Sequence, residues 1–428
     1  MKGFALLNRI LTMFTRYKTE GGREVVVARI YSSGEHTVRN SQIDKDALWA
    51  IRKIQGQGGE AYIVGGAVRD MLLGRKPKDF DIATSLSPRQ VQKLFWNARI
   101  IGRRFRIVHL YFNHDKIIEV TTFRSDEENF EEGNNNIYGT IEQDARRRDF
   151  SINSLYYNPQ NGQLLDFNNA MEDFKRKKIR SLIPLSYSFS EDPVRMIRAI
   201  KYHVTTGFSL KFDVRWAIKK NSSNLSHVST SRLTEEVGKI LSSGYAKGIF
   251  TEMNNYKLLP YLLPCLSVYI DYPEIQSALS NMDEYVKMAK KEGDVLDRAV
   301  IFSRLLKPLI VLEHPEAMSQ DERLKEVFRE IKVFISPMTP PNYEIEKSAE
   351  IILEEMGFKV KSRSKAAAAS IQGRKPGKSM GRKNAAPEEL SKPKKPRKSK
   401  KRKNIQPGAV EYPEGMESVS TLAESHDL

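Results

Sequence analysis

The sequence predicts an α+β domain, followed by an all-helical region and a disordered, basic C-terminal tail. Three observations support this fold class. Strand patterns alternate with helical ones up to residue 123, and helical patterns dominate from Arg146 to about residue 358. From residue 359 the composition is rich in Lys, Ala, Ser, Pro and Gly, which cannot bury enough apolar surface to fold.

The elements of the first part follow from local patterns. Residues 1–40 form a lead-in with one strand-like stretch, EVVVARIY, and residues 41–58 form a helix that ends at glycines. AYIV is a short buried strand, AVRDMLLG is a helix ended by Gly74, and DFDIAT is a second strand. A further helix begins at Ser87, with Pro88 in its first position.

The later elements complete this pattern. RIVHLYF and KIIEVTTFR are two strands around a turn at residues 113–115, and residues 124–144 form a polar loop. Four further stretches are predicted to be helical, namely FSINSLYY, EDPVRMIRAIKYHV, STSRLTEEVGKILSS and YAKGIFTEMNNYKLL. No internal repeat is found.

Composition excludes several classes of site. No run approaches 18 apolar residues, so no transmembrane helix and no membrane contact are expected. Basic residues interrupt the apolar N-terminus, which predicts an amphipathic start rather than a signal peptide. The single cysteine, Cys265, excludes an intramolecular disulfide and a cysteine-rich zinc site, and this fits a cytoplasmic protein.

The net charge of +17 is concentrated at one end of the chain. Between Lys359 and Lys403 there are 18 Lys and Arg residues against Glu388 and Glu389, so this segment carries +16 and the other residues together +1. Such a tail binds polyanions with little sequence preference, because each contact releases condensed counterions. We therefore expect the tail to contact nucleic acid, with a nuclear-localisation-like signal as the alternative.

The stretch VGGAVRDMLLGRKPKDFDIAT combines two features of phosphoryl-transfer chemistry. Alternate residues of a strand share one side, so Asp79 and Asp81 project together and suit Mg²⁺, which prefers oxygen ligands. The Gly65-Gly66 turn lets a phosphate approach backbone N–H groups, and Arg69 could reach a phosphate oxygen. Together they predict a site for a triphosphate and its metal. Singly, each feature is also common in ordinary turns and surface strands.

Two further motifs carry candidate site residues. Glu119 lies in the apolar strand IIEVTT, where a carboxylate is costly to bury unless it is paired or bound to a metal. It could be a third metal ligand, or an edge residue that faces solvent. In DARRRDFSIN, Arg148 could hold a ribose hydroxyl or a phosphate, and Asp149 could orient it. The alternative is an N-cap aspartate beside solvated arginines.

The motif EDPVRMIRAIKY places Glu191, Asp192, Arg195 and Arg198 on the first two turns of a predicted helix. Asp192 and Arg195 are three residues apart and therefore neighbours on one face. They offer an acceptor and a forked donor, which match the N6 amine and N1 of adenine. The alternative is a set of helix-start acids that pair with the arginines, worth about 0.3–0.5 kcal/mol.

Three motifs in series, VGGAVRDMLLGRKPKDFDIAT, RRRDFSINSLYYNP and EDPVRMIRAIKY, closely resemble those of the tRNA nucleotidyltransferase/poly(A) polymerase family. The resemblance implies a polymerase-β-like nucleotidyltransferase head at residues 41–180, a helical neck with a nucleotide-recognition helix at 181–245 and a helical, RNA-binding body at 246–358. The disordered tail then spans residues 359–428 and is basic to residue 403. The family implies template-independent addition of nucleotides to an RNA 3′ end with two metal ions.

The resemblance also implies a role for each candidate residue. It makes Asp79 and Asp81 the metal-binding catalytic carboxylates, with Asp149 in the same active-site motif and Glu119 as a third carboxylate. The nucleotide contacts that it implies are Gly65, Gly66 and Arg69 for the triphosphate, Arg148 for the ribose, and Asp192, Arg195 and Arg198 for the base and the remaining nucleotide.

Two branches of the family share these motifs. CCA-adding enzymes repair tRNA with CTP and ATP, whereas bacterial poly(A) polymerases add adenylates to diverse RNAs. Four features resemble the second branch, namely IIGRRFRIVHLYF, the lead-in RIYSSGEHTVRNSQI, the basic tail and the lack of a phosphohydrolase domain. We therefore expect a monomer that uses Mg²⁺ (two ions) and ATP to polyadenylate the 3′ ends of mRNA and other RNAs. CCA addition is the alternative, and a non-catalytic RNA-binding protein is a further one.

Overall fold

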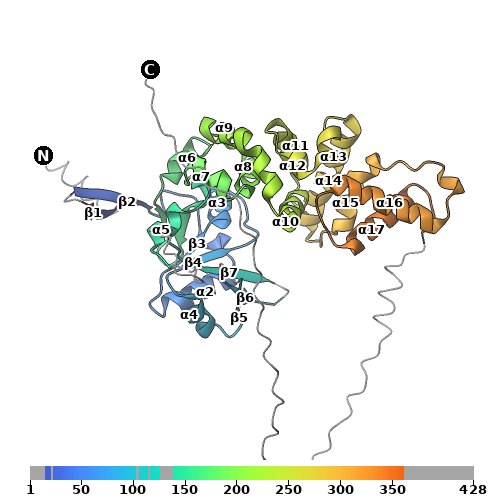
Figure 1. Ribbon diagram of the computed structural model, residues 1–428. Helices are drawn as coiled ribbons and strands as arrows, with labels where there is room; N and C mark the ends of the chain where they lie inside the picture. Colours follow the sequence, from blue (N-terminus) through green and yellow to red (C-terminus); the bar gives the residue numbers. More distant parts are fainter. Residues whose placement is uncertain (1–14, 21–22, 103–105, 114–115, 126–137, 361–428) are drawn as a thin grey trace, which may run out of the picture. The chain divides into compact units, whose positions relative to one another are not determined.

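The computed structural model describes residues 15–20, 23–102, 106–113, 116–125 and 138–360 of the chain (Figure 1). By its contacts the chain separates into two units, Met1–Ala369 and Ser370–Leu428, and all described residues belong to the first. The predicted basic tail therefore lies outside the described residues from residue 361 onward. Within the described ranges, no helix has both the length and the apolar character needed to cross a bilayer.

A nine-stranded mixed sheet forms the first part of the described chain. Its strand order is β1-β2-β9-β8-β3-β4-β7-β6-β5, in which β4 and β7 are parallel and the other described pairs are antiparallel. The strands are β1 Thr15–Glu20, β2 Arg23–Tyr31, β3 Ala61–Val64, β4 Asp81–Thr84, β5 Ala98–Ile101, β6 Ile107–Tyr111, β7 Ile117–Thr122, β8 Leu155–Asn158 and β9 Gln163–Asp166.

Helices cover both faces of this sheet. Apolar residues of α2, α3 and α4 pack on one face in a core that includes Phe80 and Ile82, whereas α5 packs on the other face in a core that includes Ala83. The helical elements of this part are η1 Asn40–Gln42, α2 Lys45–Gln55, α3 Gly66–Leu72, α4 Pro88–Leu94, α5 Ile141–Arg146, η2 Ser151–Asn153 and α6 Ala170–Lys175.

Several predicted elements are confirmed and others are wrong. The strands AYIV and EVVVARIY and the helix after Ser87 are present. The helix predicted over FSINSLYY is instead the short η2 followed by the central strand β8, and β9 was not predicted. The loop predicted at residues 124–144 ends in α5, which begins at Ile141, while residues 126–137 and the turn residues 114–115 lie outside the described ranges.

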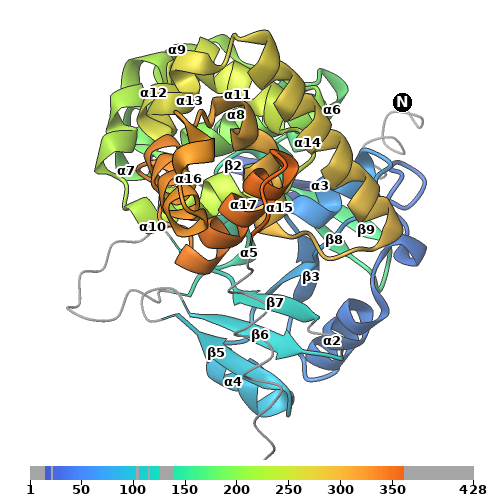
Figure 2. The same cartoon turned by 90° about the vertical axis from the view of Figure 1, so that its right-hand side faces the viewer.

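The second part is helical, as predicted (Figure 2). Its buried apolar residues form one continuous core that also includes Phe150 and Ile152 of the first part. The two short strands β10 Lys178–Ile179 and β11 Ser209–Leu210 pair at its beginning. Its helical elements are α7 Leu185–Glu191, α8 Val194–Thr206, α9 Phe212–Asn221, η3 Ser222–His227, α10 Thr230–Leu241, α11 Ala246–Asn255, α12 Leu259–Leu262, α13 Pro264–Tyr269, α14 Pro273–Glu292, α15 Arg298–Leu306, η4 Lys307–Leu309, η5 Pro315–Ala317, α16 Gln320–Ile335 and α17 Asn342–Glu355.

The lead-in is fastened to the sheet through a buried histidine. His36 is only 6% exposed, its Nε2 lies 3.0 Å from the carbonyl oxygen of Gly162, and its ring stands edge-on to Tyr157. Its Nδ1 is buried without a hydrogen-bond partner. Burial and the nearby charge of Arg39 hold the pKa of His36 below 6.5, although the hydrogen bond to Gly162 works in the opposite direction. The folded protein therefore favours the neutral form of the His36 ring.

Acidification is expected to weaken the fold through His36. Below pH 6.5 the unfolded chain takes up a proton at this residue more readily than the folded chain, so the stability that neutral His36 contributes is full above pH 6.5 and decreases as the pH falls. In His36→Gln the amide can still donate to Gly162 but does not titrate. Urea unfolding at pH 7 and pH 5 should show a smaller pH effect in this variant, and an equal effect in both proteins would contradict the assignment.

Candidate active site

A cleft of about 390 Å³ opens between the sheet, α5, η2 and α8. Nine of the eleven site residues predicted from the sequence line it, and the two exceptions are Asp79 and Arg69. The lining residues are Val64, Gly65, Gly66, Asp81, Ile107, Glu119, Thr121, Arg124, Asp144, Arg147, Arg148, Asp149, Asn153, Asp192, Arg195, Arg198 and Tyr202.

The glycine turn after β3 leaves open space at the centre of the cleft. Gly65 has φ +68°, which a residue with a side chain rarely adopts. A Cβ atom at this position would lie 3.5 Å from Nη1 of Arg148 and 3.6 Å from Oδ2 of Asp81. The turn therefore brings backbone between a guanidinium and a carboxylate, where a bound group can approach it closely.

Asp81 is the first residue of β4, and neighbouring strands fix its position. It pairs in register with Val64 of β3 and with Glu119 of β7. The sequence predicted that Asp79 lies in the same strand, but the strand begins two residues later and Asp79 is exposed. Phe80 is buried with Ile82 on the opposite face, so the chain still alternates here and directs Asp79 and Asp81 to one side.

Acidic charge accumulates at this end of β4. Burial and the charges of Glu119 and Asp79 raise the pKa of Asp81 to about 6, against the effect of Arg148. Nε2 of His109 lies 3.4 Å from Oε1 of Glu119. A carboxylate this difficult to ionise is one that a cation would stabilise, and carboxylate oxygens are the ligands that Mg²⁺ prefers. The donor set therefore fits a magnesium ion.

The protein by itself does not complete a metal-binding cluster in the described ranges. Among these residues, no three or more His, Cys, Asp or Glu side chains are grouped so that they could hold an ion alone. Mg²⁺ usually keeps several water ligands and binds one or two carboxylates together with substrate phosphates. The acidic end of β4 therefore fits a metal that enters with a phosphate-bearing substrate better than a structural metal.

Arg69 lies in α3 beside the glycine turn, and its predicted phosphate contact stays a prediction. Its guanidinium bonds Asp70, at 2.8 and 2.9 Å, and donates to Oδ1 of Asn153 at 3.0 Å, and it lies 5.0 Å from the ring of Tyr202. Asn153 and Tyr202 line the cleft, whereas Arg69 does not. Arg69 therefore supports Asn153 in the wall of the cleft, while its Nη2 lies 3.5 Å from where a Cβ of Gly66 would be.

A buried network that the sequence analysis missed holds Arg148 in place. Asp144, only 7% exposed, accepts hydrogen bonds from Arg148 at 3.1 Å, from the Tyr156 hydroxyl at 2.5 Å and from the backbone N–H of Arg124 at 3.2 Å. Burial works against its charge, but Arg148, Tyr156 and Arg147 hold the pKa of Asp144 below its ordinary value. Asp144 and Arg148 are four residues apart, and this spacing was the available signal.

Asp149 links the segment that contains η2 to helix α8. Its Oδ1 accepts from the backbone N–H of Phe150 at 2.8 Å and from Asn153 at 3.4 Å, while its Oδ2 accepts from Arg198 at 3.3 Å. The contact with Phe150 resembles the capping alternative, although η2 rather than an α-helix follows. The contact with Arg198 places a guanidinium of α8 at the cleft. Asp149 therefore contacts both the start of η2 and α8.

The pair Asp192 and Arg195, which the sequence predicted to read adenine, has a different local structure from the predicted one. Glu191 ends α7 and Asp192 lies between the helices, because α8 begins only at Val194. Arg195 donates to the Ser188 carbonyl at 3.0 Å and to Glu191 at 2.5 Å. Asp192 accepts from Arg232 of α10 at 2.8 Å, and both Asp192 and Arg195 line the cleft.

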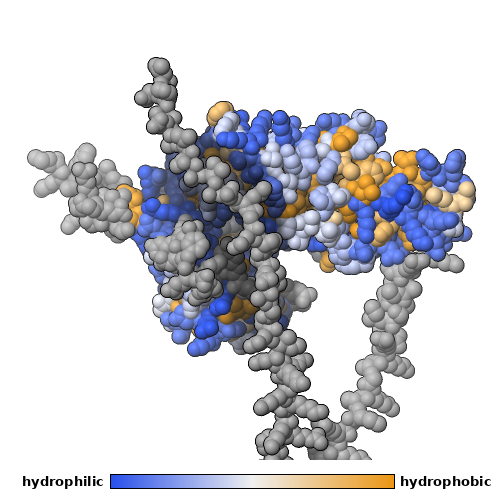
Figure 3. Space-filling model, viewed as in Figure 1, coloured by the Kyte–Doolittle hydropathy of each residue, from blue (hydrophilic) through white to orange (hydrophobic). Residues whose placement is uncertain are grey.

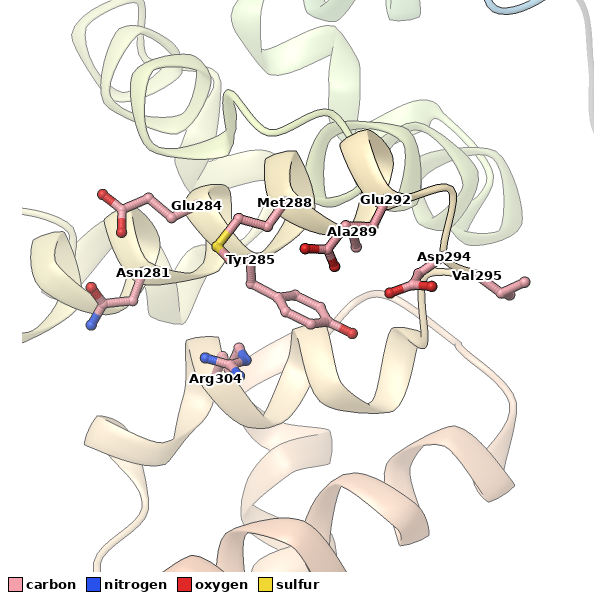
Figure 4. Close-up of a pocket in the computed structure, with 9 residues that line it drawn as sticks. All are labelled: Asn281, Glu284, Tyr285, Met288, Ala289, Glu292, Asp294, Val295 and Arg304. Atoms are coloured by element: carbon pink, nitrogen blue, oxygen red, sulfur yellow. The ribbon is translucent and has the colours of Figure 1, made fainter.

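A larger depression lies between α14 and α15 (Figure 4). Its volume is about 650 Å³, and the guanidinium of Arg304 lies 4.6 Å from the ring of Tyr285 within it. It contains none of the predicted site residues. Size alone therefore does not identify the reactive site, and the smaller cleft is the one where carboxylates, arginines and a glycine turn meet. The other lining residues are Asn281, Glu284, Met288, Ala289, Glu292, Asp294 and Val295.

Two family models match the chain. Residues 61–180 match the model described as "Poly A polymerase head domain", and residues 207–270 match "Probable RNA and SrmB- binding site of polymerase A". The first match contains β3, β4, β7 and most of the cleft, and the second begins just before α9. Both agree with the resemblance found in the sequence motifs.

Known proteins are similar over the same part of the chain. Poly(A) polymerase I of Haemophilus influenzae is 38% identical over 277 residues, which are 60% of this chain and 61% of that protein. The CCA-adding enzyme of Geobacillus thermodenitrificans is 36% identical over 205 residues, 47% of this chain and 50% of that protein. The chain thus spans about three fifths, or less, of the length of these relatives.

A solved CCA-adding enzyme in its second apo form shares the fold, with a TM-score of 0.51 and 20% identity over 82% of this chain and 92% of that one. The fold class predicted from the sequence is confirmed. The likeness to the solved enzyme concerns the fold alone. The family models and the relatives show that residues 61–180 match a poly(A) polymerase head domain and that the chain is similar to poly(A) polymerases and CCA-adding enzymes.

Proposed function

We propose that the chain adds AMP from ATP to RNA 3′ ends without a template. The observation that carries this proposal is the cleft, in which the carboxylates of Asp81 and Glu119 face a glycine turn and the guanidinium of Arg148. Opposite charges in this arrangement suit a triphosphate together with its metal. The relative named Poly(A) polymerase I, with 38% identity, favours ATP and RNA as the substrates.

The acidic end of β4 has the role of holding metal ions in this proposal. Asp79 and Asp81, with Glu119 beside them, would bind two Mg²⁺ ions. When bound, Mg²⁺ supplies activation of the RNA 3′-hydroxyl and neutralises the charge of the departing pyrophosphate. The chain's own residues position the reactants, because direct nucleotidyl transfer needs no covalent enzyme intermediate.

The basic side of the cleft has the role of orienting ATP. The backbone at Gly65 and Gly66 leaves room for the triphosphate, and Arg148, fixed by Asp144, directs its guanidinium toward this space. Charged groups fixed in advance stabilise the developing negative charge without reorganising during the reaction. Asp149 has a positioning role, since it holds Arg198 at the opposite wall.

Base selection belongs to the α7–α8 junction in this proposal. Asp192 offers an acceptor and Arg195 a donor, and each is held by a second residue, Arg232 or Glu191. Adenine requires this combination on its Watson–Crick edge. A fixed pair of this kind would select the base without a template strand.

CCA addition is the alternative, because a CCA-adding enzyme is 36% identical to part of this chain. Purified protein, Mg²⁺ and a generic single-stranded RNA should be incubated with each labelled nucleotide separately. Polyadenylation predicts a long ladder with ATP alone. Incorporation of CMP into a tRNA that lacks its end, without a ladder, would favour CCA addition, and no incorporation of any nucleotide would favour a non-catalytic RNA-binding protein.

Other parts of the sequence-based prediction stay predictions. These are the segment borders at residues 180, 245 and 358, the monomeric state, the cytoplasmic location and the use of mRNA as a substrate. The RNA contact assigned to the basic tail concerns residues beyond 360, which the structure does not describe.

A further inference from the structure

One face of α9 combines exposed aromatic rings with basic side chains. Phe212 is 74% exposed and Trp216 is 58% exposed, although large aromatic side chains are usually buried. They are four residues apart, and Arg215, Lys219 and the neighbouring Lys220 share their side of the helix, because these positions repeat at helical spacing. The rings and charges therefore form a single stripe along α9.

The stripe faces away from the protein core. The other side of α9 buries Val214, Ala217 and Ile218 in the helical core. In both ribbon views α9 lies at the border of the helical part, with no other described helix beyond it (Figures 1 and 2). The orientation of α9 therefore leaves both rings exposed to solvent. A ligand can contact them without any change in the helix.

Each exposed ring has a cation beside it. Nζ of Lys220 lies 4.9 Å from the centroid of the Trp216 ring, and the guanidinium of Arg215 lies 5.8 Å from that of Phe212. Nζ of Lys219 similarly lies 5.6 Å from the ring centroid of Tyr256, the residue that follows α11. Rings that alternate with cations suit a chain that alternates bases with phosphates.

More positive charge adjoins the start of the stripe. The pairing of β10 with β11 brings the run Lys175–Lys178 next to Lys211, with the Ser209 N–H donating to the Lys177 carbonyl at 2.9 Å. The acids closest in sequence are Glu172 and Asp173, which pair with Arg176 and Arg180, and Asp213, whose Oδ1 accepts from the N–H of Val214. Figure 3 shows a mainly hydrophilic surface in this part of the molecule, in contrast to the apolar patches over α13–α17.

We propose that this surface, the α9 stripe with Lys175–Lys178 and Lys211, binds single-stranded RNA by stacking bases on Phe212 and Trp216. The proposal rests on the proposed function, and it adds a second RNA contact that is independent of the tail. From charge, the sequence analysis assigned polyanion binding to the tail, and it assigned RNA binding to residues 246–358 only through the family resemblance. The structure shows that a nearly neutral net charge still leaves one locally basic surface. The matched family model names RNA for residues 207–270 as a whole, without a face or a binding mode.

The test compares two ligands of equal length, 20-nucleotide oligo(A) RNA and an abasic phosphodiester chain, by fluorescence anisotropy with EDTA present and the full chain throughout. Wild-type protein should bind oligo(A) more tightly than the abasic chain. In Phe212→Ala/Trp216→Ala the affinity for oligo(A) should fall at least tenfold, while that for the abasic chain changes little, because each base–ring stack contributes about tenfold. Trp96→Ala, which removes a 90% exposed ring of the first part, is the matched control and should bind as wild type.

A second measurement tests the charges. In Lys219→Gln/Lys220→Gln the slope of log affinity against log salt should decrease by about 1.4, because single strands release about 0.7 counterions for each phosphate contact. Unchanged oligo(A) affinity in the aromatic variant, or an equal loss for both ligands, overturns the proposal, and the first result would favour a protein partner for this face.

The same variants separate this inference from the proposed function. At saturating RNA the aromatic variant should extend RNA with ATP at the wild-type rate, with a raised KM for RNA. A protein that adds no AMP but shows the binding difference would overturn the proposed function alone. A protein that adds AMP but lacks the difference would overturn the α9 surface alone.

Discussion

Asp81→Asn is expected to lower the rate of AMP incorporation by about 10³-fold at saturating ATP and RNA, without a loss of RNA binding. Asn keeps the shape of the side chain but removes the charge that a divalent cation requires. The site also loses the carboxylate whose pKa burial raises to about 6, which lies across Gly65 from Arg148. Losing one preorganised electrostatic group from an active site costs about 10²–10³-fold, and losing a metal ligand adds to this. Extension of labelled oligo(A) RNA measures the rate.

Two controls accompany this variant. Asp294→Asn changes an exposed carboxylate of the α14–α15 depression and should retain the wild-type rate. Mg²⁺ with ATP should raise the thermal unfolding midpoint of the wild type and of Asp294→Asn, but raise that of Asp81→Asn much less, since ligands stabilise only the state that they bind. A rate within tenfold of wild type in Asp81→Asn would refute the role given to this carboxylate.

Asp144→Asn is expected to lower the free energy of unfolding by about 3 kcal/mol and to weaken ATP binding. The substitution leaves the guanidinium of Arg148, whose side chain is 20% exposed, without its carboxylate partner, and breaking a buried ion pair from one side costs about 3–5 kcal/mol. Because the pKa of Asp144 lies below its ordinary 3.8, this contribution is full at neutral pH and is lost only as the pH falls below that value. Urea unfolding at pH 7 measures the loss.

Tyr156→Phe provides the matched comparison for Asp144. It removes the hydroxyl that donates to Asp144 and accepts from Nε of Arg148, but leaves the ion pair in place. Its expected cost is about 1–2 kcal/mol, which is smaller because no charge loses its partner. If Asp144→Asn proves as stable as the wild type, or less harmful than Tyr156→Phe, the network does not hold Arg148 in the way described.

Local sequence patterns predicted some elements well and others wrongly, and burial explains the difference. The strand AYIV and the helix after Ser87 have clear boundaries, with glycines before one and a capping serine in the other. Strand β8 lies in the middle of the sheet, and its residues Leu155–Tyr157 are all buried. A strand covered on both faces shows no alternation, so FSINSLYY could not be distinguished from a buried helix without its neighbours.

The sequence predicted which residues form the candidate site better than it predicted how their side chains contact one another. The motifs supplied Gly65, Asp81 and Arg148, and the fold brings all three within one cleft. The four-residue spacing of Asp144 and Arg148 was not recognised as a signal, because residues 124–144 were predicted to be a polar loop rather than to include the start of α5. Spacing also did not reveal that Arg69 supports the wall, since Asn153, its partner, is 84 residues away in the chain.

The sequence by itself determined the chemical groups and the local turns of this protein. The glycine pair, the Asp-x-Asp motif and the order of the three motifs all depend on residues a few positions apart, where backbone geometry alone decides what meets. Only the tertiary structure decided which acidic side chain pairs with which basic one. Asp192 is three residues from Arg195 in the chain, yet its carboxylate bonds Arg232, forty residues further on. An ion pair forms where folding brings two charged groups within a few ångströms, and spacing along the chain sets that distance only for near neighbours.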